Sequence, residues 1–263
     1  RLAEFIAVQI SQLLEHHRLL KKVSILEAER QLQRLQDDFI AMISHEFYTP
    51  LGFIKGYVTT LLREDTQWNA ETSREFLTII DEEADHLRSL IDDLIDSYRL
   101  QSGTLRFQYQ SVNLESLLQE IVSRALTRYG TLDVHLKVPP DIVVYGDPVR
   151  LAQVFNNLIS NVAKYAPGSP IVITVEDVLG GCQISFQDQG PGIPEEYQEH
   201  LFNRFFRVPG SNKQIHGTGL GLYMCRQIVQ AHRGEIRATS GQTMGTTIWI
   251  TLPKEPDESQ MEG

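Results

Sequence analysis

The sequence has no long apolar run, few cysteines and no excess of basic residues, and each absence limits what the protein is. No eighteen consecutive residues are apolar, so no segment of this chain predicts a membrane span. The two cysteines, Cys182 and Cys225, fit no metal-ligand spacing and indicate a reducing compartment. A net charge of −10 argues against a nucleic-acid partner, which needs a basic face for phosphates.

The sequence also lacks a starting methionine and a signal pattern. Its first residues, RLAEFIAVQI, do not follow the charged-then-apolar order of a signal peptide and look like the middle of a helix. We therefore expect a cytoplasmic fragment of a longer protein, whose upstream part carries a sensor region or a membrane anchor. The polar residues 255–263 predict a flexible tail.

Apolar residues at coiled-coil spacing fill the beginning of the chain. The first seam consists of Ile6, Ile10, Leu13, His17 and Leu20, and the second of Ile25, Ala28, Leu32, Leu35, Phe39 and Met42. The step from Leu20 to Ile25 breaks the register, which changes supercoiling locally. This favours two dimer-forming segments joined by a twist, with a signalling helix over residues 1–24, over a single long solvated helix.

A helical hairpin is expected over residues 25–103. The first helix should continue to about Glu64, where DTQWNA supplies a turn, and a second amphipathic helix should end at Ser102–Gly103. A hairpin of two antiparallel helices buries only one side. We therefore expect two copies to form a dimeric four-helix bundle.

After Gly103, short β-branched runs alternate with helical stretches. Strands are expected at Asp133–Val138, Ile171–Asp177, Gln183–Gln187 and Thr246–Leu252, and helices at Leu114–Arg128, Pro148–Tyr165 and Leu220–His232. Residues 104–254 therefore predict an α/β sandwich, so that the fold class of the chain is α followed by α/β.

One polar group interrupts the helical pattern of the hairpin, in the segment FIAMISHEFYTPL. His45 lies two residues from the core-facing Ile43 and Phe47, so it should point to solvent. Glu46 can accept its Nδ1 proton, which leaves Nε2 as a nucleophile, and Thr49 lies one turn further along. Pro50 should bend the helix at this place. Taken without these neighbours, a histidine on a helix surface usually has no role.

Three polar segments follow in the α/β region. Asn157, Asn161 and Lys164 share one helix face, where amide oxygens suit Mg²⁺ and the lysine adds positive charge, although an ordinary polar face is an equal alternative. The loop Asp188–Pro194 can accept an amino group of a base, but DxGxG is also a common turn. His216–Leu222 places glycines before a helix, which suits phosphate, and it is neither a Walker loop nor a dinucleotide fingerprint.

The order of these segments, with Leu201–Arg207 between the two glycine loops, resembles the sensor histidine kinase family from about Ile25 to Pro253. The resemblance implies phosphorylation of His45, with Glu46 as the adjacent acid and Thr49 and Pro50 in the family's positions. It further implies that ATP and Mg²⁺ are cofactors, with Asn157 and Asn161 as metal ligands. The implied nucleotide-binding residues are Asn157, Asn161, Lys164, Tyr165, Asp188, Gly190, Gly192, Arg207, Gly217, Thr218, Gly219, Leu220, Gly221 and Thr246.

The sequence departs from the family pattern at a few positions. Phe47–Tyr48 replaces Leu-Arg, Val162 replaces a common Ala, Gln189 replaces a frequent Asn, and Thr243 stands where a glycine is usual. Val208–His216 is similar to the family's lid over ATP. The resemblance implies phosphoryl transfer to an aspartate of a response regulator, and Thr49 implies phosphatase activity toward it. The alternatives are an ATPase clamp with the same type of nucleotide pocket (a GHKL-type ATPase) and a non-catalytic signalling scaffold.

Overall fold

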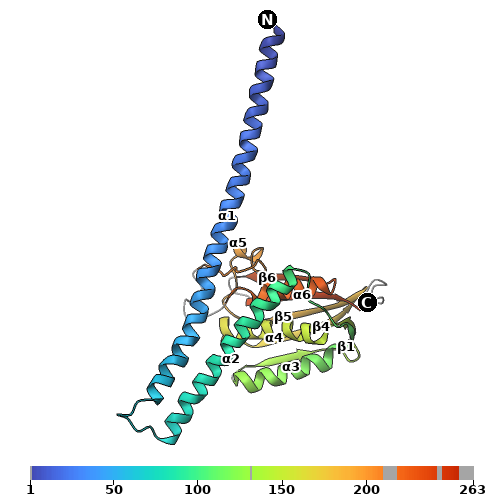
Figure 1. The fold of residues 1–263 in the computed structure, drawn as a ribbon. Helices are drawn as coiled ribbons and strands as arrows, with labels where there is room; N and C mark the ends of the chain where they lie inside the picture. Colours follow the sequence, from blue (N-terminus) through green and yellow to red (C-terminus); the bar gives the residue numbers. More distant parts are fainter. Residues whose placement is uncertain (1, 131, 210–217, 242–244, 255–263) are drawn as a thin grey trace. The chain divides into compact units, whose positions relative to one another are not determined.

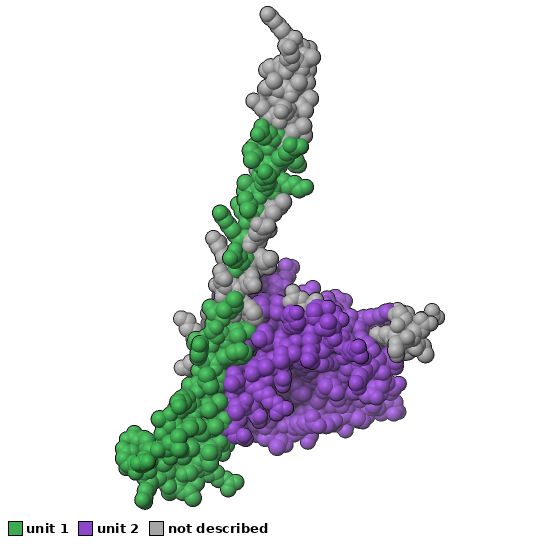
Figure 2. All heavy atoms as spheres, in the orientation of Figure 1, with its two compact units in different colours: residues 1–80 green, residues 81–263 purple. Residues whose placement is uncertain are grey.

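The computed structural model describes residues 2–130, 132–209, 218–241 and 245–254, and over parts of the first helix it describes the backbone alone. The chain divides into two compact units, Arg1–Ile80 and Asp81–Gly263 (Figure 2). Among the described residues, no helix combines the length and the apolar character that crossing a bilayer requires.

The first unit consists of the long first helix, the turn after it and the start of the second helix, which continues into the second unit. Helix α1 (Leu2–Leu61) ends three residues before the predicted Glu64, and α2 (Ala70–Gln101) begins at Ala70, the last residue of the predicted turn (Figure 1). The turn is fixed by Trp68, whose Nε1–H donates to the carbonyl of Thr60 at 3.0 Å and whose ring packs edge-on against Phe76. The predicted helical hairpin is therefore confirmed as a pair of helices.

Helix α1 continues through Pro50. Its ring is buried, and it removes the hydrogen bond that the carbonyl of Glu46 would otherwise receive. The proline thus weakens one step of the helix without ending it. Most side chains of the two predicted seams, and the tail 255–263, lie outside the described residues.

A five-stranded sheet forms the second unit. Its strands are β2 (Val134–Lys137), β4 (Ile171–Val178), β5 (Gly181–Gln187), β7 (Gly245–Pro253) and β6 (Glu235–Gly241), in that order across the sheet. Only the β2–β4 pair is parallel. Two further short strands, β1 (Gln110–Asn113) and β3 (Val143–Gly146), pair with each other. The four predicted strands are present, whereas β1, β3 and β6 were not predicted.

Helices cover one face of this sheet (Figure 1). They are α3 (Leu114–Tyr129), α4 (Pro148–Tyr165) and α6 (Gly221–Ala231), and a single short turn forms α5 (Glu195–Gln198). Alternate residues of β4, at Ile171, Ile173 and Val175, are buried, as expected for a strand with one covered face. The rings of Phe155 on α4 and Phe186 on β5 lie 5.6 Å apart in the core. The predicted α/β sandwich is confirmed.

A buried histidine joins the end of α6 to the beginning of α4. The Nε2 of His232 accepts the backbone N–H of Asp147 at 2.9 Å, so its Nδ1 carries the proton and donates to the carbonyl of Ile228 at 2.8 Å. Burial lowers the pKa of His232, which keeps the ring neutral. Asp147 in turn caps α4 by accepting the N–H of Val149. The two helices that bear predicted nucleotide-binding residues are therefore held at a fixed spacing.

Candidate functional site

The predicted phosphoacceptor lies on the surface of α1. His45 is exposed, whereas the neighbouring Glu46 is buried, with 3% of its surface exposed. The hydroxyl of Thr49 donates to the carbonyl of His45 at 3.0 Å, so it lies one turn along the same helix. An imidazole in this position is accessible to a large substrate, while its acidic neighbour is held in place by its surroundings.

Helix α4 carries four of the predicted residues on the side away from the core. Asn157 and Asn161 are half-buried, and Lys164 and Tyr165 are exposed. The opposite side of α4 is buried through Leu151, Val154, Phe155, Leu158, Ile159 and Val162. The helical period therefore places both amides and the ammonium on one polar face, as the spacing predicted.

Asp188 follows β5 and is held by its own loop and by the start of β7. Its Oδ1 accepts the N–H of Gly190 at 2.7 Å and that of Thr246 at 3.2 Å. Both hydrogen bonds from described residues go to Oδ1, so Oδ2 is available to an amino group of a ligand. The backbone N–H of Asp188 donates to the carbonyl of Thr246 at 2.9 Å, which fixes the loop to the sheet. Three predicted residues are thus brought together.

The two glycines of this loop are required by close packing. A Cβ on Gly190 would lie 2.6 Å from the Cβ of Ala166, and one on Gly192 would lie 2.2 Å from the carbonyl oxygen of Gly241. Gly192 also has a φ of +73°, in the left-handed region that glycine tolerates. A side chain at either position would therefore push the Asp188 loop away from α4 and β6.

Two serines that the sequence analysis did not identify support this loop. The hydroxyl of Ser240 accepts the N–H of Ile193 at 2.7 Å and donates to the carbonyl of Gly245 at 2.8 Å. The hydroxyl of Ser169 accepts the N–H of Gln189 at 2.7 Å. Isolated serines give no sequence signal, because their partners are backbone groups far along the chain.

The second glycine loop lies at the start of α6. Gly219 has a φ of +66°, its carbonyl accepts the N–H of Phe205 at 3.1 Å, and a Cβ there would lie 2.7 Å from the carbonyl carbon of Phe205. Thr218 is buried, and its hydroxyl accepts the N–H of Leu220 at 3.3 Å. A Cβ on Gly221 would lie 3.7 Å from the amide carbon of Asn157, so this loop adjoins the polar face of α4.

Some predicted residues are not tested by these contacts. Gly217 and most of the predicted lid, Val208–His216, lie outside the described residues, as does Thr243. Arg207 is half-buried beside Phe206, and its segment precedes the undescribed part of the lid.

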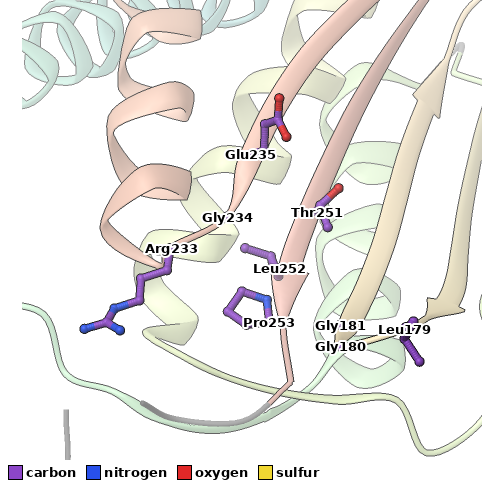
Figure 3. A pocket seen from close by; sticks show the side chains of 9 residues that line it. All are labelled: Leu179, Gly180, Gly181, Arg233, Gly234, Glu235, Thr251, Leu252 and Pro253. Atoms are coloured by element: carbon purple, nitrogen blue, oxygen red, sulfur yellow. The ribbon is translucent and has the colours of Figure 1, made fainter. Parts of the chain in front are cut away.

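The described residues of the second unit line at least two hollows. One, of about 570 Å³, is lined by residues 165–170 and 189–191, which include Tyr165 and Gly190 of the predicted site. The other, of about 280 Å³, is lined by the β4–β5 turn, the start of β6 and the end of β7 (Figure 3), and it contains none of the predicted residues. It lies at the start of β5, roughly 23 Å along the strand from Asp188. The first hollow is the one that adjoins the candidate site.

Comparison with protein families gives two matches along the chain. The family model described as the His Kinase A (phospho-acceptor) domain matches residues 35–103. The model described as the Histidine kinase-, DNA gyrase B-, and HSP90-like ATPase matches residues 146–256. The first contains His45 and the second contains α4, the Asp188 loop and the start of α6.

Curated relatives are similar over most of this chain. The signal transduction histidine-protein kinase BaeS of Escherichia coli (strain K12) is 34% identical over 238 residues, which are 89% of this chain and 50% of the relative. The sensor protein kinase WalK of Staphylococcus aureus is 30% identical over 86% of this chain and 56% of the relative. The chain therefore spans about half the length of these relatives.

Solved structures share the fold. ShkA, in a complex with AMPPNP, superposes with a TM-score of 0.60 at 25% identity, over 82% of this chain and 46% of that one. ThkA, in a complex with the response regulator protein TrrA, gives 0.63 at 24% identity, over 87% of this chain and 65% of that one. AdeS of Acinetobacter baumannii gives 0.62 at 23% identity, over 81% and 98%.

Proposed function

Because this chain belongs to the sensor histidine kinase family, we propose that it transfers the γ-phosphoryl group of ATP to Nε2 of His45. The observation that carries the proposal is the exposed imidazole of His45 on α1, in a chain that also contains an ATP-binding domain of this family. Glu46 orients the imidazole and takes the Nδ1 proton, so that Nε2 attacks with its lone pair. The buried position of Glu46 suits a carboxylate with a fixed role.

The base of ATP is proposed to bind at the Asp188 loop. The free Oδ2 of Asp188 accepts the exocyclic amine of adenine, while Gly190 and Gly192 let the ring approach the backbone and Thr246 supports the carboxylate. The phosphates then bind near the start of α6, at Thr218, Leu220 and the glycines, where free N–H groups and the helix dipole attract negative charge. Tyr165, at the end of α4, lines the adjoining hollow.

Mg²⁺ is proposed to bind at Asn157 and Asn161. Both amides are half-buried on one face of α4, and a Cβ on Gly221 would lie 3.7 Å from the amide carbon of Asn157, so Asn157 adjoins the glycine loop proposed for the phosphates. Two amide oxygens fit Mg²⁺, which keeps waters and phosphate oxygens as its other ligands. When bound, the ion neutralises charge on the phosphates. Lys164 and Arg207 add positive charge for the same purpose.

The domain organisation follows from these roles. We propose residues 1–24 as a signalling coiled coil, 25–103 as the dimerisation and phosphotransfer domain, 104–254 as the catalytic ATP-binding domain and 255–263 as a tail. The partners are a second copy of this chain, an upstream sensor region and the receiver domain of a response regulator, whose aspartate accepts the phosphoryl group from His45. The complex of the relative ThkA with a response regulator supports the last of these. This core is proposed to act in the cytoplasm.

The proposal is tested by replacing the phosphoacceptor. His45→Ala should abolish labelling by radioactive ATP and leave ATP affinity unchanged, since His45 lies outside the ATP-binding domain. The wild-type label should be acid-labile and base-stable, as expected for phosphohistidine. His16→Ala, which removes another exposed histidine from the same helix and lies outside both predicted seams, is the matched control and should label normally.

Each rival function predicts a different outcome of this experiment. An ATPase clamp would hydrolyse ATP without labelling the protein, and a non-catalytic scaffold would not bind ATP in calorimetry. A labelled His45→Ala protein would show that the phosphoacceptor has been assigned to the wrong residue.

A further inference from the structure

The last turns of α2, within the second unit, hold α4 through an ion pair. The carboxylate of Asp96 accepts a hydrogen bond from the guanidinium of Arg150, and these side chains are 16% and 18% exposed. Gln153 donates to the same carboxylate oxygen at 3.4 Å, and its own oxygen accepts from Arg150 at 2.9 Å. A mostly buried, charge-assisted contact therefore joins the two helices.

A second carboxyl lies one turn earlier on α2. Burial raises the pKa of Asp93 to about 6, the charges of Asp96 and Asp92 add to the increase, and Lys164 of α4 opposes it. The charge of Asp93 also acts on the thiol of Cys225 on α6, whose pKa burial raises to about 12, so the thiol stays neutral. Asp93 therefore gains or loses its charge in mildly acidic solution. This change alters its interaction with Lys164 of α4.

The face of α4 that meets these carboxylates is the proposed nucleotide face. Arg150, Gln153, Asn157 and Lys164 are spaced by three, four and seven residues, which places them along one side of the helix. The negative charge of α2 and the phosphates of ATP thus act on the same positive side chain, Lys164. Two anionic groups that share one cation weaken each other's binding.

The contact depends on charge more than on apolar area. Among the described hydrophobic residues in the last turns of α2, Leu100 is the one that packs against the hydrophobic core. Contacts of this composition open and close more readily than an apolar core does. The phosphoryl transfer proposed above requires such mobility. The catalytic domain has to bring ATP to His45 and then move away, so that the regulator can reach the phosphorylated histidine.

We propose that Asp93 and Asp96 form a latch on α4 which acid closes and bound nucleotide opens. The nucleotide part rests on the proposed function, since it places ATP phosphates at Lys164, whereas the acid part does not. With α2 released, Asp93 has the pKa of an ordinary exposed carboxyl, near 3.8. The closed latch therefore binds the proton more tightly, so its closing strengthens as the pH falls from about 6 toward 4 and is constant above about pH 6.

The fraction of molecules in which the latch is closed can be obtained from a distance distribution within the second unit. Spin labels are attached at Ser89→Cys on α2 and Ser116→Cys on α3, both exposed, while the native Cys182 and Cys225 are buried. Labelled protein is diluted into unlabelled protein, so that only distances within one subunit contribute. Distance distributions are recorded by pulsed electron resonance at pH 5.0 and pH 7.5.

The equilibrium constant for closing should be about tenfold larger at pH 5.0 than at pH 7.5 in the wild type, because one pH unit separates pH 5.0 from the pKa of Asp93 in the closed state. Asp93→Asn, which imitates the protonated carboxyl, should be closed equally at both pH values. Asp92→Asn removes the charge of the exposed neighbour, which is the smallest of the causes that raise the pKa of Asp93, so most of the pH response should remain. If Asp93→Asn keeps the full pH response, the assignment to this carboxyl is wrong.

The ion pair is tested by exchanging its charges. Asp96→Arg and Arg150→Asp should each open the latch at both pH values, and the double variant should restore the closed distance. A single variant that remains closed, or a double variant that remains open, would overturn the role of this pair.

Adding AMPPNP at pH 7.5 should lower the closed share in the wild type and leave Asp93→Asn unchanged. An unchanged wild type would refute the nucleotide part while the acid part stands. Labelling of His45 by ATP is recorded separately, so failure of the proposed kinase reaction is distinguishable from failure of the latch.

Discussion

The two units differ in where their apolar side chains lie. In the second unit, Phe155, Ile184 and Met224 are fully buried within one cluster. In the first unit, Ile40, Leu51 and Phe53 expose 57%, 50% and 49% of their surface. One unit therefore buries its core within a single chain, whereas the other leaves apolar surface that a second copy of α1 and α2 would cover.

This difference teaches that the two units obtain their stability in different ways. A domain with a complete core unfolds at a point independent of protein concentration, whereas a bundle assembled from two chains becomes more stable as concentration rises. The following predictions separate the units on that basis, or sharpen the contrast between binding ATP and transferring its phosphoryl group.

The largest effect is expected for Phe155→Ala. Removing this ring from the core should cost about 3–5 kcal/mol of the free energy of unfolding of the second unit, because the cavity cannot collapse fully. Urea unfolding should show that transition at lower denaturant, with the transition of the helical unit unmoved. Val149→Ala, on the same helix but 70% exposed, should change little. Equal shifts in both transitions would mean that the two units unfold as one.

Asp188→Asn should reduce ATP affinity and leave both unfolding transitions in place. The new amide nitrogen would replace an acceptor with a donor opposite the amine of adenine, at a cost of about 1–3 kcal/mol or roughly five- to 150-fold in affinity. Calorimetric titration measures this directly. Asp177→Asn, at the far end of the same β4–β5 pair and bonded to Lys254, serves as the control. Unchanged affinity would show that the base binds elsewhere.

The smallest effect on ATP chemistry is expected for Thr49→Ala. Its hydroxyl lies one turn from His45 and cannot assist attack on ATP, so autophosphorylation should stay within a few-fold of the wild type. Dephosphorylation of the phosphorylated regulator should slow, because we propose that this hydroxyl orients a water against the aspartyl phosphate. Thr59→Ala removes a hydroxyl with the same bond to the preceding turn and should leave both rates unchanged. A wild-type dephosphorylation rate would remove the phosphatase role alone.

Sequence periodicity predicted the elements of the fold that repeat a clear pattern. Helix α4, with an apolar stripe and Asp147–Pro148 at its start, agrees with its predicted bounds, because cap, period and length all indicate the same helix. The short strands β1 and β3 were missed because four residues carry too few repeats for a period of two. Strand β6 contains Arg237 and two serine or threonine residues, so its alternation is weak.

The candidate site was predictable where it depends on local motifs and not where it depends on long-range contacts. Gly190 and Gly192 mark their loop because backbone packing excludes a side chain. In contrast, Ser240 supports Ile193 from 47 residues away, and Asp96 meets Arg150 across 54 residues. No pattern within either segment records such pairs, since they follow from how the elements pack.

The two tryptophans are divided between the units, one in each. Trp68 is fixed in the turn of the hairpin by the carbonyl of Thr60, and Trp249 in β7 donates to the hydroxyl of Thr239 and lies beneath the guanidinium of Arg237. Each unit therefore contains its own intrinsic fluorophore in a distinct polar setting. Replacing either indole by phenylalanine leaves an emission signal that belongs to the other unit, so the behaviour of the first unit and that of the second unit are separable by light alone, without an added dye.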